Sequence, residues 1–150
     1  MKSILTSALI LTFATSPSFA LEPPAQYMRL AARLTRNIGH QLELYAARDV
    51  ALSVCNEKLP NRYESISSKF TKFSIDAQFN LVSNELAKEN ITDPDTIVVL
   101  KVIMSGFSAG YSQSFGDELR LKLQNKTAGV IQATCDNEAV SATNIMSSSN

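Results

Sequence analysis

The sequence has very few of the side chains on which most catalytic and metal sites depend. Among its 150 residues there are one histidine, His40, two cysteines and no tryptophan. A structural zinc site needs four cysteine or histidine ligands, and the chain also lacks the CxxC motif of redox cysteines. A catalytic triad would have to be built around His40 alone. We therefore predict no catalytic residues, no metal site and no cofactor.

The chain has no excess of charge of either sign. Lysine and arginine total 14, aspartate and glutamate also total 14, and the formal net charge is zero. Contacts to nucleic acid phosphates need a clear basic excess, so nucleic acid is not an expected partner. This balance still leaves room for a local basic surface.

No apolar run is long enough to span a bilayer, which takes about 20 residues. The first apolar run, at residues 4–14, is instead typical of a signal peptide, with Lys2 before it and a small-x-small cleavage sequence at residues 18–20. The alternative is a retained membrane anchor. We favour a cleaved signal peptide at residues 1–20, and hence a periplasmic or secreted protein that is not an integral membrane protein after cleavage.

Cys55 and Cys135 are the only cysteines, and both lie in the exported part of the chain. Export and an even number of cysteines favour a disulfide over two free thiols. The bridge would close a loop of about 80 residues, which a chain-entropy argument rates at about 4.5 kcal/mol of stability. We therefore predict a Cys55–Cys135 disulfide.

Apolar residues recur at intervals of three and four through most of the mature chain, which is typical of amphipathic helices. Periodicity and boundary residues predict helices at residues 25–58 with a break or bend at Gly39, 61–89, 93–116 and 118–135. Residues 118–124 alternate as a strand would, but their strong helix formers favour helix. The prediction is an all-α bundle of four to five helices, a single domain at residues 21–135 with a flexible tail at 136–150.

The segment from Asp93 to Gly116 is the longest nearly uncharged stretch of the mature chain. It begins with the helix-start signals Asp93 and Pro94, and its apolar residues fall on nearly all sides of a helix. Such a helix is expected to be buried between others, at the centre of the bundle. Gly106 and Gly110 would then form a flat strip for close helix packing.

One surface feature is specific enough to predict a binding site. Arg29, Arg33, Arg36 and His40 are spaced by four, three and four residues, which places them within an arc of about 60° on a helix. The ordinary alternative is a solvated helix face, because outer faces are usually charged. As a functional surface, this basic ridge would bind an acidic protein partner or an anionic envelope surface, since arginine forms paired hydrogen bonds with carboxylate and phosphate groups.

Two other functions remain as alternatives. Residues 106–110, GFSAG, match the G-x-S-x-G pattern of serine hydrolases, but no histidine follows Ser108 to complete the catalytic set. A pocket for a small apolar ligand beside the glycine strip would be lined by Phe70, Phe73, Phe79, Phe107, Tyr111 and Phe115. We favour a small exported interaction protein, such as an inhibitor, an immunity-type partner or an envelope accessory protein, over an enzyme.

The exported protein is expected to begin at Leu21, because signal peptidase cuts after a small residue such as Ala20. N-terminal sequencing or an intact mass of protein isolated from the periplasm or the medium checks this. A membrane-extracted protein that still begins at Met1 would contradict the signal peptide.

Overall fold

The computed structural model describes residues 24–148, and every regular element in that range is a helix. In chain order the helices are α1 (Ala25–Lys58), α2 (Glu64–Lys88), α3 (Pro94–Leu123) and α4 (Ala128–Ser148). The predicted all-α bundle is confirmed, with four helices. The predicted signal peptide at residues 1–20 lies outside the described residues.

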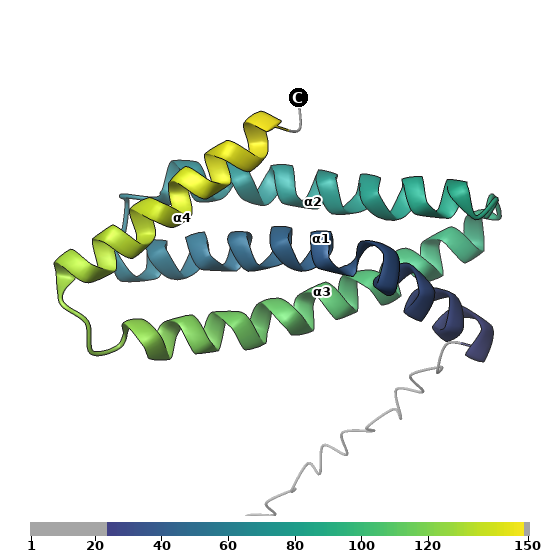
Figure 1. Ribbon diagram of the computed structural model, residues 1–150, viewed down its shortest axis with the longest axis horizontal. Helices are drawn as coiled ribbons and strands as arrows, with labels where there is room; N and C mark the ends of the chain where they lie inside the picture. Colours follow the sequence, from purple (N-terminus) through teal and green to yellow (C-terminus); the bar gives the residue numbers. More distant parts are fainter. Residues whose placement is uncertain (1–23, 149–150) are drawn as a thin grey trace, which may run out of the picture.

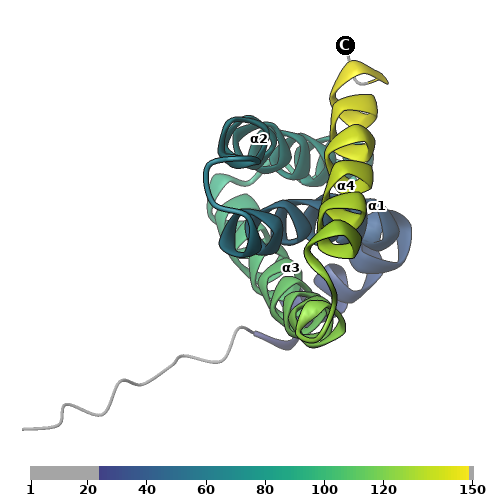
Figure 2. The same ribbon diagram turned by 90° about the vertical axis from the view of Figure 1, so that its left-hand side faces the viewer.

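α1 is the axis of the bundle, and each of the other three helices packs against it. α2 and α3 diverge from their short connection, and α4 lies obliquely across the far end of the bundle (Figures 1 and 2). α2 and α3 contact each other much less than either contacts α1. The inward side of α1 therefore supplies the shared core, with ten buried residues: Ala31, Leu34, Ile38, Gly39, Leu42, Ala46, Ala51, Leu52, Val54 and Cys55.

The core is spread along α1 in several clusters. The largest joins the first half of α1 to the end of α2 and the start of α3, and consists of Ala31, Leu34, Ile38, Leu42, Val82, Leu86, Leu100 and Met104. Smaller clusters join the second half of α1 to the end of α3, and to α2 with α4. Each helix is thus held on α1 by its own set of buried apolar side chains.

Of the break or bend predicted at Gly39, the break is wrong, because α1 continues through this residue. One straight helix over residues 25–58 would be too long for a round domain of this size. A helix of 34 residues is about 51 Å long, and the bundle is instead elongated along it, with the first turns of α1 inclined to the remainder (Figure 1). Gly39 is buried, and the methyl of Thr35, one turn earlier in α1, lies 3.1 Å from where its Cβ would be, so a larger residue would crowd that side chain.

The start of α3 follows the predicted signals. The Asp93 carboxylate accepts a hydrogen bond from the backbone N–H of Thr96 at 2.8 Å, and Pro94 occupies the first turn. The hydrogen bonds from Thr96 hold the pKa of Asp93 below its usual range. The cap satisfies one of the N–H groups that every helix start leaves without an intrahelical partner.

α3 is not the buried central helix that its composition predicted. Leu100 and Met104 are buried against α1, but Val98 and Val102 are 60% and 68% exposed on the opposite side. α3 packs chiefly on α1, so its outer side is left open. An apolar residue on a helix need not be covered within the same chain, and this is why composition misplaced α3.

The close-packing role predicted for Gly106 and Gly110 is also wrong within the described chain. Both glycines are exposed, and a Cβ added at either would meet no atom within 4 Å. The glycine of α3 that does permit close packing is Gly116, where a Val50 methyl of α1 lies 2.8 Å from the Cβ position. Sequence spacing placed the two glycines opposite Leu100 but could not show that α1 covers only the Leu100 side.

Residues 118–123 are helical, so the strand alternative for this segment is excluded. Leu119 and Leu123 are buried in a cluster with Val54 of α1, whereas Leu121 is 71% exposed. The alternating leucines therefore serve two sides of a helix.

The flexible tail predicted from residue 136 is helical as far as Ser148. Ala142 is fully buried in the cluster shared with α1 and α2, and Ile145 and Met146 pack against that cluster. The apolar side of α4 consists largely of alanines and well-separated larger residues, which gave too weak a periodicity to predict.

The predicted Cys55–Cys135 disulfide is confirmed. The two Cα atoms are 5.6 Å apart, and both cysteines are fully buried beside Tyr63 from the turn before α2. The bridge joins the last turn of α1 to the first half of α4. It closes the chain where α4 crosses the end of the bundle.

Replacing both cysteines, Cys55→Ala with Cys135→Ala, is expected to lower the free energy of unfolding by about 4 kcal/mol, because the unfolded chain regains the freedom of a long loop. Urea denaturation of the variant and of the oxidised protein measures the difference. A loss below about 1 kcal/mol, or two alkylatable thiols in protein folded in its own compartment, would contradict a structural bridge.

Candidate functional site

The four residues of the predicted basic ridge all lie on the exposed side of the N-terminal half of α1. Arg29, Arg33, Arg36 and His40 span about 16 Å along the helix axis. Their direction is fixed by the opposite side of the same turns, where Leu34 is fully buried against α2 and α3. The structure therefore brings the four side chains together on one face, while their role in binding stays a prediction.

The ridge carries more positive charge than the helices around it neutralise. The Arg33 guanidinium pairs with the carboxylate of Glu89, just after α2, at 2.7 Å. Within residues 24–148, Arg29, Arg36 and His40 have no carboxylate partner. Two guanidinium groups and an imidazole are therefore available to an outside molecule.

The three arginines border a broad, open hollow of about 610 Å³ on the surface of α1. Its lining is completed by Ala25, Gln26 and Leu30. Side chains of a single helix form this hollow, so it encloses nothing. An open surface of this kind can contact the side of another macromolecule. The apolar Leu30 lies between the charged arginines.

Sequence reasoning missed the polar contacts that hold α2 on α1. The Asn37 side-chain amide donates a hydrogen bond to Glu85 Oε1 at 2.7 Å, and the Thr71 hydroxyl donates one to Asp49 at 2.6 Å. Hydrogen bonds from Lys88 and then from Asn37 hold the pKa of Glu85 below its usual range. No local spacing signals these contacts, because each joins residues far apart in the chain.

Ion pairs join α1 to the other two helices. Arg48 pairs with Glu138 of α4, and Arg120 of α3 forms two hydrogen bonds with Glu57, at 2.7 and 2.9 Å. The hydrogen bond from Arg120 holds the pKa of Glu57 below its usual range, and the same contact raises the pKa of Arg120.

The carboxylates whose pKa is displaced are all held more acidic than usual. This applies to Glu57, Glu85 and Asp93, which therefore stay ionised at neutral pH. A general acid needs the opposite displacement, towards neutrality. Within the described residues, no group of three His, Cys, Asp or Glu side chains is placed to hold a metal ion.

Ser108 joins α3 to α2. Its hydroxyl donates a hydrogen bond to Gln78 Oε1 at 2.7 Å, and Gln78 Nε2 donates in turn to the buried Ser74 hydroxyl at 2.9 Å. Ser108 lies in the middle of α3 and not on a turn between a strand and a helix, as a nucleophile elbow requires. An amide oxygen is too weak a base to take the hydroxyl proton. The geometry is that of a polar contact between helices.

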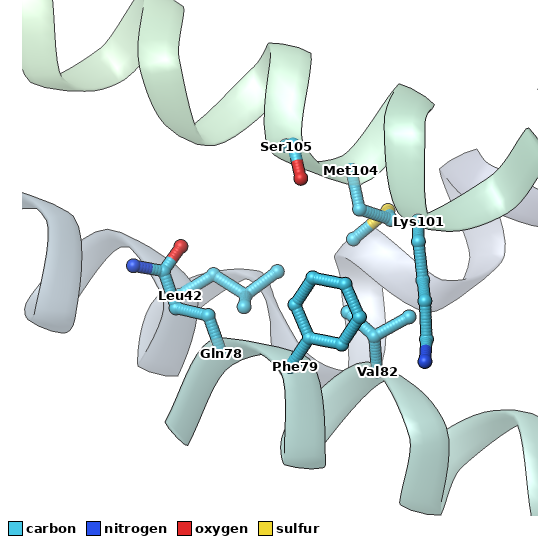
Figure 3. A pocket seen from close by; sticks show the side chains of 7 residues that line it. All are labelled: Leu42, Gln78, Phe79, Val82, Lys101, Met104 and Ser105. Atoms are coloured by element: carbon cyan, nitrogen blue, oxygen red, sulfur yellow. The ribbon is translucent and has the colours of Figure 1, made fainter. Parts of the chain in front are cut away.

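The cavities beside α3 are small. One of about 20 Å³ lies between α2 and α3, with Leu42 of α1 also lining it, and Phe79 and Lys101 lie side by side along it (Figure 3). The Lys101 Nζ atom is 4.3 Å from the centroid of the Phe79 ring. Another, of about 40 Å³, lies between α1 and α3. Sites for small organic ligands are usually about 300–1,000 Å³, so these spaces suit only water.

The six aromatic side chains predicted to line a pocket do not gather in one place. Phe70 and Phe73 pack together with ring centroids 5.7 Å apart, in the cluster under α4. Tyr111 and Phe115 stack on each other further along α3, at 6.3 Å. The aromatic residues are thus divided between separate helix contacts.

No described helix combines the length and the hydropathy needed to cross a bilayer. No family model, curated protein or solved structure matches the chain. A functional conclusion therefore rests on the charge and shape of the ridge.

Ser108→Ala is expected to cost about 1 kcal/mol of stability, because the Gln78 contact is lost, and to change no reactivity. Thermal denaturation measures the first effect, and labelling with a fluorophosphonate probe measures the second. Ser114→Ala, at an exposed position of the same helix, is the control and should not lower stability, because alanine is the better helix former. Labelling of the unaltered protein that disappears in Ser108→Ala would show that the serine is a nucleophile.

Proposed function

We propose that this protein is a small exported interaction protein that binds an acidic protein partner through the basic ridge of α1. The observation that carries the proposal is the alignment of Arg29, Arg36 and His40, all exposed and without a carboxylate partner in residues 24–148.

Export is supported by the cysteine chemistry. A fully buried disulfide forms and persists in oxidising compartments such as the periplasm or the extracellular medium. The sequence of residues 1–20 independently favours export. Together, the two observations support an envelope or secreted location.

An acidic protein suits the ridge better than a phosphate-rich polymer or a membrane. The whole chain has a formal net charge of zero, so it has no overall attraction to a polyanion. The face is one helix wide and about 16 Å long, which matches one helix or extended segment carrying a few carboxylates. The planar guanidinium group of arginine forms two parallel hydrogen bonds with a carboxylate. Leu30 adds an apolar contact between the arginines of the ridge.

The double variant Arg29→Gln with Arg36→Gln is expected to weaken partner binding at least about tenfold, chiefly through a slower association rate, and to leave the melting temperature nearly unchanged. Glutamine keeps the helix propensity and removes two charges. The Arg33–Glu89 pair stays intact, so folding is not disturbed. A photo-crosslinker at Gln26, beside the ridge, captures the partner, and titration calorimetry at two salt concentrations measures the affinity.

The matched control is Lys69→Gln with Lys72→Gln, which removes two exposed charges from α2 and should leave binding unchanged. The affinity of the unaltered protein should fall with added salt. Equal affinities and equal salt dependence in both double variants would show that the ridge is only a solvated face. Binding to anionic vesicles without any acidic protein partner would also contradict the proposal.

A further inference from the structure

The outer side of α3 is an apolar helix face that the rest of the described chain leaves uncovered. Val98 and Val102 are among its most exposed large side chains, at 60% and 68%. They are four residues apart, so they follow one another in a single row along the helix. Apolar surface of this kind, gathered on one element, is typical of an interaction surface.

The same row continues with two glycines. Gly106 and Gly110 follow Val102 at intervals of four, and neither has an atom within 4 Å of its Cβ position. A glycine inside an exposed helix costs about 1 kcal/mol relative to alanine. No contact within residues 24–148 requires a glycine at either place. The row thus consists of two projecting side chains followed by two gaps.

This arrangement is complementary to itself. When two copies of α3 lie antiparallel about a two-fold axis level with position 104, Val98 faces Gly110 of the other copy, and Val102 faces its Gly106. Each valine then fills the space left by a glycine, so four gaps are filled at once. Symmetric dimers need a surface that matches itself in this way.

The charge pattern also fits a second copy. Between Asp95 and Asp117, α3 has one charged residue, Lys101. Its ammonium lies over the Phe79 ring of α2 and not on the valine–glycine row. A two-fold axis brings like charges together, so the centre of a symmetric interface must be nearly neutral. The basic ridge of α1 fails this condition, whereas the outer face of α3 meets it.

We propose that the protein forms a symmetric dimer through the outer face of α3, with valines 98 and 102 of each copy packed on glycines 110 and 106 of the other. The proposal is independent of the function of the ridge. A contact made mainly by one pair of helices lies at the small end of stable interfaces, so we expect a dissociation constant in the range of about 1–100 μM.

Sedimentation equilibrium of the oxidised mature protein measures this constant. Gly106→Leu fills the gap that receives Val102, and Val102→Asp places two carboxylates near the two-fold axis. Each is expected to raise the dissociation constant at least about tenfold. Gly106→Leu should raise the melting temperature of the monomer, because open space receives the new side chain and the helix loses a glycine. Leu121→Asp, at a position 71% exposed on the same helix, is the control and should dimerise as the unaltered protein does.

The register is tested by mixing. Val102→Cys protein mixed with Gly106→Cys protein should form a mixed disulfide faster than either forms one with itself. A protein that stays monomeric up to about 200 μM would overturn the proposal. A dimer that Gly106→Leu and Val102→Asp leave unchanged, or one that forms no mixed disulfide, would overturn it equally.

Discussion

Burial of apolar side chains against α1 is the interaction on which the other three helices depend. α2 and α3 contact each other much less than either contacts α1, and α4 lies across one end, so removing the inward side of α1 would remove most of the shared core. The fully buried Leu34 and Leu52 lie in different clusters along this helix. Each buried leucine contributes on the order of 2 kcal/mol by removal from water. An elongated bundle follows, because a core distributed along one helix must be about as long as that helix.

Polar contacts add specificity to this apolar packing. Asn37 and Asp49 bond to α2, Arg48 to α4 and Glu57 to α3, so α1 has at least one polar contact with each neighbour. Apolar surfaces alone permit helices to slide, since leucine packs acceptably in several registers. A hydrogen bond between fixed positions favours one register over its neighbours. These contacts fix how α1 is rotated against its neighbours, and this rotation decides which way the basic ridge faces.

The sequence predicted an all-α bundle correctly, but it missed the helix at residues 136–148 and the continuity of α3 through Gly116. It predicted poorly which helix covers which face. Local signals, such as the Asp93 cap and the spacing of the arginines, depend on residues close in the chain, and these predictions held in the structure. The burial of α3 and the packing of Gly106 depend on which helix covers which face. The sequence shows which face of a helix is apolar, but it does not show which other element packs against that face. The ridge was found because exposure opposite an apolar stripe is itself a local property, whereas the pairing of Arg33 with Glu89 joins different parts of the chain and left no local signal.

The Cys55–Cys135 bridge also has a mechanical consequence. It makes the chain between the two cysteines a covalent ring that contains all of α2 and α3. A force that pulls on the two ends of the protein enters this ring at one cysteine and leaves it at the other, so the backbone of α2 and α3 carries none of the tension. The segment between the two cysteines, about 280 Å long when fully extended, therefore cannot be stretched while the bridge is intact. Only α1 before Cys55 and α4 beyond Cys135 can be drawn out while the bridge is intact.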